Sequence, residues 1–206
     1  MHKSVIFNDS AAESGFTLIE MMVTVAVLVI LAMVAGPGLQ EYVARSGMTS
    51  VRNDFSVALQ RARSDAISRN TCVSICQLAS ASAGTCASAG ELGNWHKGWI
   101  IHVNNSCTTV APAVALPPDD IIAVRQAGND RYRLTDKSQV APASLLTFDA
   151  RGTLVSGGAS FEVTDAKDKG SPNARVIVIN MQGRVAVRSF GALAQADGES
   201  VSAEDK

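Results

Sequence analysis

The chain has 206 residues, which is enough for one compact domain and one membrane segment. It carries 18 Lys and Arg against 19 Asp and Glu, and loss of residues 1–15 would leave the remainder formally neutral. A neutral chain has no overall electrostatic attraction to nucleic acid or anionic lipid, so either role would need a local patch of charge.

A long apolar run lies near the N-terminus. Met21 to Gln40 contains no charged residue, and Thr24 is the one clearly polar side chain before Gln40. About 20 such residues are needed to cross the hydrocarbon core as a helix. The sequence therefore predicts one membrane crossing and offers no second candidate.

The residues before this run do not fit a secretory signal peptide. Such a signal has a basic start and a small-residue cleavage site after its apolar part, whereas here acidic residues predominate and Met33 occupies a position that requires a small residue. A plain signal anchor leaves Glu20 unexplained, because a carboxylate near the membrane core costs about 2.5–3.5 kcal/mol and normally indicates a partner. Alternatively, Glu20 reaches the nearby interface.

Helical periodicity continues beyond the apolar run. Pro37 removes a backbone donor and predicts a kink or local unwinding between Gly36 and Gly38. A second helical stretch is predicted to about Ser68. Its apolar residues recur at steps of three and four: Met48, Val51, Phe55, Ala58, Leu59, Ala62 and Ala66.

From Thr71 the pattern changes to short β-rich runs separated by Gly, Asn and Ser. Met181-Gln182-Gly183 is predicted to form a hairpin turn between the last two runs. Long loops are expected at 79–93 and 104–120, and residues 192–206 are expected to form a frayed tail. The candidate strands are Cys72–Leu78, Gly98–Val103, Ile121–Arg125, Leu145–Phe148, Ser160–Val163, Arg175–Asn180 and Arg184–Ser189.

Four cysteines fall within 36 residues, at positions 72, 76, 86 and 107. An even, clustered count suits two disulfides in an oxidising compartment. On one strand, Cys72 and Cys76 would lie about 13 Å apart, so each needs a partner elsewhere. The rival is a zinc site that uses cysteines with His96 or His102, but no cysteine pair has the tight CxxC spacing of structural zinc sites.

Catalytic and cofactor motifs are not found in the sequence. Ser, His and Asp are present, but no nucleophile-elbow, phosphate-loop or HExxH spacing occurs. We therefore expect no enzyme, no catalytic residue, no cofactor and no metal.

The segment Ser14-Gly15-Phe16-Thr17-Leu18-Ile19-Glu20-Met21-Met22 resembles the class III signal of type IV prepilins and type II secretion pseudopilins. The resemblance implies that a membrane peptidase cuts after Gly15 and methylates the new amine of Phe16. It also implies that the helix forms the filament core, where Glu20 pairs with the terminal amine of a neighbouring subunit. Such pairing would supply the partner that a buried charge needs. A helix-kinking Pro37 is in keeping with the same proteins.

Four further parts of the sequence resemble the FimT/FimU/GspH group of minor pilins. They are residues 62–67, residues 70–76 followed by Cys86 and residues 95–100, residues 148–152, and residues 177–180 ahead of 182–185. This resemblance implies an α+β type IV pilin fold. A long N-terminal helix, half membrane-spanning and half packed on the head, would precede an antiparallel β-rich globular domain. The implied boundaries are a cleaved leader at 1–15, a membrane and filament-core helix at 16–40, an amphipathic stalk helix at 41–70, a head at 71–191 and a tail at 192–206.

The resemblance also bears on the cysteines and on DNA. A bridge around the loop between Cys76 and Cys86 is common in heads of the FimU type, which leaves Cys72 with Cys107. Some FimT-like pilins bind DNA through a C-terminal Gly-Arg-x-Arg motif. Gly183-Arg184 matches that motif but Ala186 replaces its second Arg, so a DNA contact would depend on Arg184 and Arg188, with a steep dependence on salt.

Taken together, the resemblance implies a minor type IV pilin that primes or joins pilus assembly. The alternatives are the type II secretion pseudopilin H and a DNA-binding pilin for natural transformation. The implied partners are other pilins or pseudopilins, the prepilin peptidase and methyltransferase, the inner membrane and, as a further candidate, DNA. The implied location is a single pass through the inner membrane with the head in the periplasm, although Arg45 and Arg52 after the span do not favour it by charge.

Overall fold

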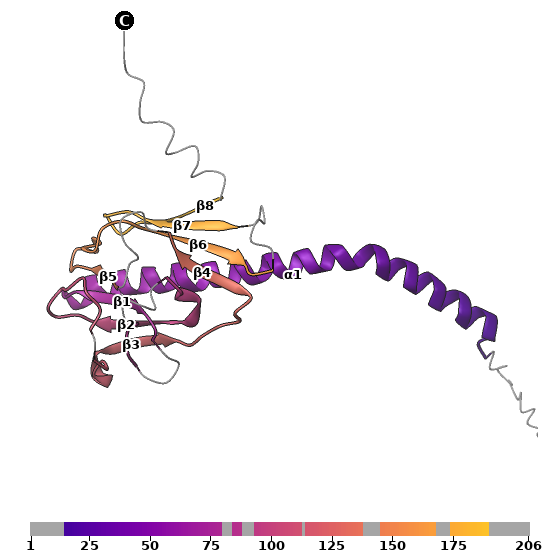
Figure 1. Cartoon of the computed structure of the whole chain (residues 1–206), viewed down its shortest axis with the longest axis horizontal. Coiled ribbons are helices and arrows are strands. Elements are labelled where there is room, and N and C mark those ends of the chain that lie inside the picture. The colour runs from indigo at the N-terminus through magenta and orange to yellow at the C-terminus, as the bar shows by residue number, and fades with distance from the viewer. Residues whose placement is uncertain are drawn as a thin grey trace, which may run out of the picture. The chain divides into compact units, whose positions relative to one another are not determined.

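A computed structural model describes residues 15–79, 84–87, 93–112, 114–137, 145–167 and 174–189. The chain divides into two compact units, Met1–Val43 and Ala44–Lys206, each of which is described by itself. A single helix, α1 (Leu18–Arg69), begins in the first unit and ends in the second (Figure 1). The expected tail at 192–206 and the leader up to residue 14 lie outside the described residues.

In the first unit, the apolar part of α1 is exposed along its whole length. Leu18–Ala35 has a mean hydropathy of 2.7 and, among the described residues, is the one segment long and apolar enough to cross a membrane. The helix continues through residues 36–38, so Pro37 does not end it. The kink at this proline stays a prediction.

In the second unit, α1 buries the stripe that the sequence predicts. All seven residues of the stripe, from Met48 to Ala66, are buried in the main core. The helix ends at Arg69 because Asn70 takes a left-handed conformation with φ of 52°. The N–H groups of Asn70 and Thr71 donate to the carbonyls of Ile67 and Ala66, both at 3.3 Å, a pairing that satisfies the last turn.

Two four-stranded antiparallel sheets complete the head (Figure 1). The first has the order β3-β2-β1-β5 and the second the order β4-β6-β7-β8. The strands are β1 (Val73–Gln77), β2 (Trp99–Val103), β3 (Ile121–Arg125), β4 (Tyr132–Asp136), β5 (Leu145–Phe148), β6 (Ala159–Asp165), β7 (Arg175–Ile179) and β8 (Val185–Ser189), with short 3-10 helices η1 (Trp95–Lys97) and η2 (Pro118–Asp120).

The main core lies between α1 and both sheets. Phe55 of α1 is fully buried, and its ring centroid lies 5.5 Å from that of Trp95, 5.1 Å from Trp99 and 4.8 Å from Phe161. These edge-to-face contacts join the helix to η1, β2 and β6, because aromatic rings prefer such angled packing. The stripe on α1 therefore fixes the helix against both sheets at once.

A second, smaller core covers part of the first sheet. It contains Cys76, Leu78, Cys86, Ile100 and Leu145. Cys76 and Ile100 are cross-strand partners in β1 and β2, whereas their chain neighbours Ile75 and Ile101 belong to the main core. Because side chains alternate along a strand, the two cores lie on opposite faces of this sheet.

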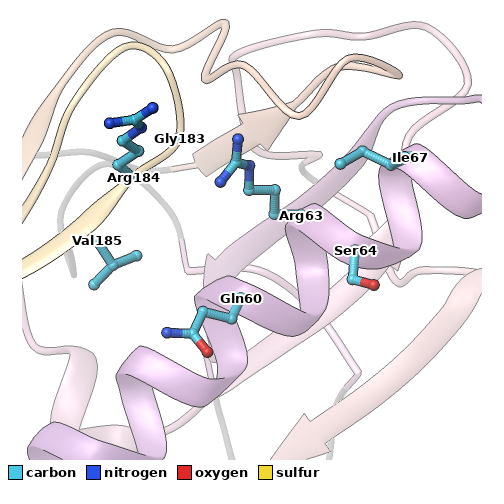
Figure 2. Close-up of a pocket in the computed structure, with 7 residues that line it drawn as sticks. All are labelled: Gln60, Arg63, Ser64, Ile67, Gly183, Arg184 and Val185. Carbon is cyan, nitrogen blue, oxygen red and sulfur yellow. The ribbon is translucent and has the colours of Figure 1, made fainter.

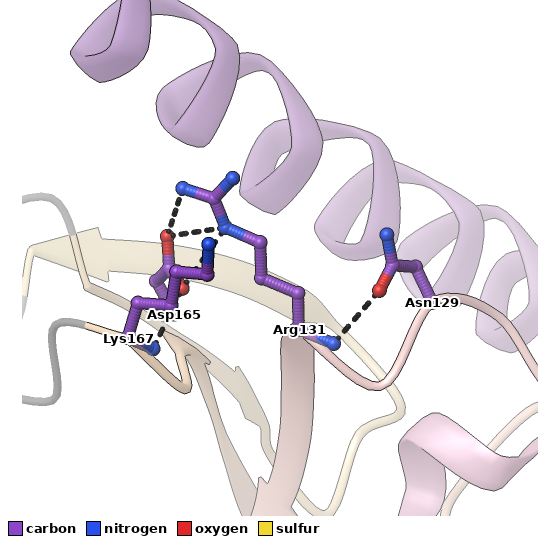
Figure 3. Close-up of polar contacts among 4 residues, drawn as sticks. All are labelled: Asn129, Arg131, Asp165 and Lys167. Carbon is purple, nitrogen blue, oxygen red and sulfur yellow. Dashed lines mark hydrogen bonds and ion pairs between the residues drawn. The ribbon is translucent and has the colours of Figure 1, made fainter.

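Of the eight strands in the described residues, seven coincide with predicted strands within two residues at each end, and β4 is the exception. In β4 only Leu134 is fully buried, and charged or polar residues surround it, so the segment lacks the apolar pattern of a strand. Tertiary contacts hold it in place. Arg131, next to β4, contacts Asp165 at the end of β6, with 2.9 Å between Nη2 and Oδ2 (Figure 3).

Candidate functional site

The junction between Gly15 and Phe16 lies in non-helical backbone directly ahead of α1. Both residues are exposed, and a Cβ added at Gly15 would meet no atom within 4 Å. The bond that the prepilin-like motif marks is therefore accessible in the structure. A cut there would leave every residue of α1 in place.

Thr17 and Glu20 form the start of the helix. The backbone N–H of Glu20 donates to Thr17 Oγ1 at 3.3 Å, so Thr17 caps the first turn. An acidic residue three positions after a capping Thr is the pattern of a capping box, and the positive end of the helix dipole favours its charge. Glu20 thus has a local role in starting α1, which the sequence interpretation did not consider.

A groove forms where α1 faces the hairpin that joins β7 to β8 (Figure 2). It has a volume of about 530 Å³. Its lining residues come from two segments far apart in sequence: Gln60, Arg63, Ser64 and Ile67 from α1, and Gly183, Arg184 and Val185 from the hairpin.

Arg63 lines this groove and contacts the turn at 148–152. Its Nε donates to the carbonyl oxygen of Gly152 at 2.9 Å. Gly152 and Gly183 both have positive φ, at 77° and 72°, and a Cβ on Gly183 would collide with the Gly152 carbonyl oxygen. Only glycine fits both the conformation and the space. The 148–152 turn and the hairpin therefore pack backbone against backbone, and the Arg63 side chain joins the helix to them.

Asp149 organises the turn that presents Gly152. Its Oδ1 accepts hydrogen bonds from the N–H groups of Arg151 and Thr153, both at 2.9 Å, and its Oδ2 accepts from Thr153 Oγ1 at 2.7 Å. Burial raises the pKa of Asp149, but these hydrogen bonds, with the nearby charge of Arg151, outweigh it and hold that pKa below its ordinary value. The carboxylate is therefore a structural part of the turn.

The arginines considered for a DNA contact are only partly brought together. Arg184 and Arg188 are both exposed, but Arg184 lies in the turn before β8 and lines the groove, whereas Arg188 lies within the strand. Arg175 pairs with Ser189 in the β7–β8 register, whereas Arg188 pairs with Val176. Arg175 therefore lies on the face of the sheet opposite to Arg188.

The structure joins Cys72 to Cys107 and Cys76 to Cys86, the pairing that the resemblance implies. Cys107 ties the loop after β2 to the start of β1, and Cys86 ties the loop after β1 to that strand. Both bridges therefore fasten long loops to the first sheet.

The two histidines in the described part of the chain are buried but lie in different places. His102 is in β2 on the face of the second core, and burial lowers its pKa. His96 is in η1, where burial and then the charge of Arg133 lower its pKa. Of the two, only His102 lies beside a cysteine pair, Cys76 and Cys86. Sequence reasoning named both histidines but could not tell them apart.

Comparison with known proteins gives a consistent result. The sequence profile of the family described as "Type II transport protein GspH" matches residues 52–183, and that of the "Prokaryotic N-terminal methylation motif" matches residues 10–36. A crystal structure of the type IV minor pilin FimU of Pseudomonas aeruginosa is similar, with a TM-score of 0.50 and 25% identity over 71% of this chain and 92% of that one. A second crystal form gives a TM-score of 0.48 and 26% identity over 68% and 91%.

Two fimbrial proteins are similar over shorter stretches. Fimbrial protein EcpC of Eikenella corrodens is 51% identical over 41 residues, which are 20% of this chain and 27% of that protein. A fimbrial protein of Pseudomonas aeruginosa is 46% identical over 56 residues, or 27% and 36%. The chain thus matches about a quarter to a third of the length of these fimbrial relatives.

The expected fold class is confirmed, because the long N-terminal helix and antiparallel sheets match the pilin fold of FimU. The GspH profile covers well over half of the chain and ends within the β7–β8 hairpin, so it includes the 148–152 turn and Arg63. The chain belongs to the GspH family and carries the prokaryotic N-terminal methylation motif at its start.

Proposed function

We propose that this protein is a minor type IV pilin, built into or priming a pilus together with other pilins. The observation that carries the proposal is the order of two parts in one chain. A methylation motif at 10–36 opens directly into an exposed apolar helix, and a head of the GspH family with the fold of FimU follows. The role is structural and needs no catalytic residue or cofactor.

In this proposal the prepilin peptidase removes residues 1–15 and methylates the amine of Phe16. The accessible Gly15–Phe16 bond ahead of α1 supports this step. Glycine is open to replacement here because a larger side chain would meet nothing in the folded subunit. A processing defect in a Gly15 variant would therefore report on the peptidase and not on folding.

Glu20 has the assembly role in this proposal. Its carboxylate would pair with the methylated amine of Phe16 on a neighbouring subunit, within the apolar helices of the filament. Burying a carboxylate among such helices is unfavourable without an opposite charge, and the amine supplies one. The segment Leu18–Ala35 would hold the subunit in the inner membrane before assembly, with the head in the periplasm, where its disulfides could form.

The type II secretion pseudopilus is the alternative filament, and the family description itself refers to type II transport. Both fimbrial relatives and FimU favour the pilus. Deletion of the gene tests the choice. We expect loss or strong reduction of surface pili with type II secretion intact. Loss of secretion with pili intact would instead identify the pseudopilus.

Complementation of that deletion tests Glu20. We expect Glu20→Ala protein to be cut and methylated but absent from filaments, while Glu41→Ala, an acidic residue on the same helix outside the apolar run, restores assembly. Incorporation of Glu20→Ala at the level of the unsubstituted protein would remove Glu20 from the proposed assembly role.

A further inference from the structure

A compact group of metal-binding atoms lies in the second core. The Sγ atoms of Cys76 and Cys86 and a ring nitrogen of His102 all lie within 4.8 Å of one another. Cys76 is on β1 and pairs with Ile100, while His102 pairs with Ser74. The two side chains are therefore diagonal neighbours on one face of the sheet.

All three side chains are shielded from solvent. Cys76 is fully buried, and Cys86 and His102 retain exposed fractions of only 6% and 3%. Apolar residues of the second core surround the cysteines, including Leu78 and Leu145. A metal held here would be enclosed by protein and would have three protein ligands, one fewer than a structural zinc site.

Hydrogen bonding leaves one ring nitrogen of His102 available as a ligand. Its Nδ1 lies 3.0 Å from the carbonyl oxygen of Val103, and a carbonyl can only accept, so Nδ1 carries the proton. The other nitrogen, Nε2, then has a lone pair. It is buried and has no hydrogen-bond partner among the described residues. Metal-binding histidines commonly donate their other ring N–H to a backbone carbonyl in this way.

We infer that, when the Cys76–Cys86 bridge is reduced, Cys76, Cys86 and His102 Nε2 form a binding site for a thiolate-preferring metal ion of the zinc class. Zinc takes Cys sulfur at about 2.3 Å and His nitrogen at about 2.0–2.1 Å, which places tetrahedral ligand atoms roughly 3.5–3.8 Å apart. In the bridged state the three atoms span up to 4.8 Å, so side-chain movement of about 1 Å after reduction would bring them to these distances. The site departs from the sequence expectation of no metal.

The bridge and the metal exclude each other. A dithiol reductant transfers two electrons and two protons to the Cys76–Cys86 bond, which yields two thiols, and the reductant itself becomes a disulfide. Binding of Zn²⁺ to both sulfurs then releases the two thiol protons, because the ligands are thiolates. In either state the loop that carries Cys86 stays fastened to β1. The metal would protect the thiols from oxidation until it is removed.

The other disulfide offers no comparable site. Among the described residues, the group of Cys76, Cys86 and His102 is the single cluster of three or more such ligands, and neither Cys72 nor Cys107 belongs to it. The buried His96, which is not in the cluster, is a matched control for His102.

The test uses the full-length protein in detergent, reduced with a phosphine under anaerobic conditions and titrated with Zn²⁺ against a chromophoric chelator. We expect one Zn²⁺ per reduced chain and none for the oxidised protein. Loss of partners outside the ligand shell already weakens metal binding 10–100-fold, so His102→Ala should weaken it by at least about tenfold. His96→Ala should leave the affinity unchanged. Co²⁺ should give thiolate charge-transfer absorption that is altered in His102→Ala.

A Cys72→Ser/Cys107→Ser background leaves Cys76 and Cys86 as the single cysteine pair, and should still bind one Zn²⁺. If that background fails to fold by circular dichroism, the comparison of His102→Ala with His96→Ala in the four-cysteine protein still decides the matter. Failure of the reduced protein to bind Zn²⁺ stoichiometrically would overturn the site. So would equal affinities of His102→Ala and unsubstituted protein, or equal binding by oxidised protein.

Discussion

Arg63 of α1 donates a hydrogen bond from its Nε to the carbonyl oxygen of Gly152, at 2.9 Å, across 89 residues of sequence. The contact joins the helix to the 148–152 turn, and the hairpin at Gly183 packs against both. These are three of the segments by which the head resembles minor pilins. The three segments therefore meet at one place in the fold, where the second half of α1 contacts the hairpin between the last two strands.

We predict that Gly183→Ala destabilises the head. The new Cβ would collide with the Gly152 carbonyl oxygen and approach Arg63 and Phe148, and such overpacking costs about 1–3 kcal/mol beyond the strain of positive φ. Chemical denaturation of the full-length protein in detergent would measure the loss.

Gly157→Ala is the matched control. Its φ of 87° carries similar strain, but a Cβ there meets no atom within 4 Å. It should therefore cost only about 1–2 kcal/mol, from the backbone conformation. Equal losses in the two variants would show that the close approach at Gly183 contributes nothing.

The aromatic centre of the core gives a second prediction. Phe55→Ala removes a fully buried ring that contacts Trp95, Trp99 and Phe161, and should destabilise the head by about 3–5 kcal/mol. Val57, two residues away on the same helix, is 62% exposed, so Val57→Ala should change stability by less than about 0.5 kcal/mol. Similar losses would contradict the packing of this helix face.

The strongest sequence signals were those that repeat. The apolar stripe from Met48 to Ala66 predicted the buried face of α1, since seven residues at helical spacing agree with one another. β4 was missed because Leu134 is its one fully buried residue, and its place depends on pairing with β6 and on distant partners such as Asp165. Periodicity shows which face is buried but not which distant segment covers it.

The functional residues also fall into two groups, those that the sequence reveals and those that only the fold reveals. Gly15, Phe16 and Glu20 are recognisable because their motif is continuous in sequence. Arg63 contacts Gly152, which is 89 residues away in sequence. His102 lies beside Cys86 and Cys76, which are at least 16 residues away. Sequence spacing alone does not reveal either contact. For His102, the decisive facts are the carbonyl at Nδ1 and the cysteines nearby, which only the pairing of β1 with β2 brings together.

The ion pair between Arg131 and Asp165 gives a third prediction. Asp165 is 2% exposed, and hydrogen bonds from the Arg131 side chain outweigh burial and lower its pKa (Figure 3). Arg131→Ala leaves that buried carboxylate without its charged partner and should lower the denaturation midpoint of the head. Arg61, 56% exposed and 3.7 Å from Asp65, is the control, and Arg61→Ala should have little effect. A larger loss in Arg61→Ala would contradict this assignment.

The buried histidines predict how stability depends on pH. Burial lowers the pKa of His96, and the charges of Arg133 and, to a smaller extent, Lys97 lower it further. Asp130 and the backbone of Leu134 raise that pKa but do not outweigh the lowering. Burial also lowers the pKa of His102, against the smaller raising effects of the Val103 carbonyl and Asp120. The folded state thus binds protons less readily than the unfolded state, whose histidines titrate near 6.5. Stability should be full above pH about 6.5 and should fall as the pH drops below it towards the lowered folded values.

Denaturation midpoints at pH about 7, 6 and 5 would measure this slope. A double variant, His96→Gln/His102→Gln, should flatten it, because Asp149 and Asp165, with lowered pKa values, affect stability only at more acidic pH. An unchanged slope in the double variant would show that other groups cause it.

The most direct test of the account is mass spectrometry of the N-terminal peptide of this protein in purified surface filaments. It asks at once whether the chain reaches a filament and how its start was processed. We predict a peptide that begins at Phe16 with a methylated amine and lacks residues 1–15. A peptide that retains Gly15, one that begins elsewhere, or absence of the protein from the filaments would contradict the proposal of a processed minor pilin.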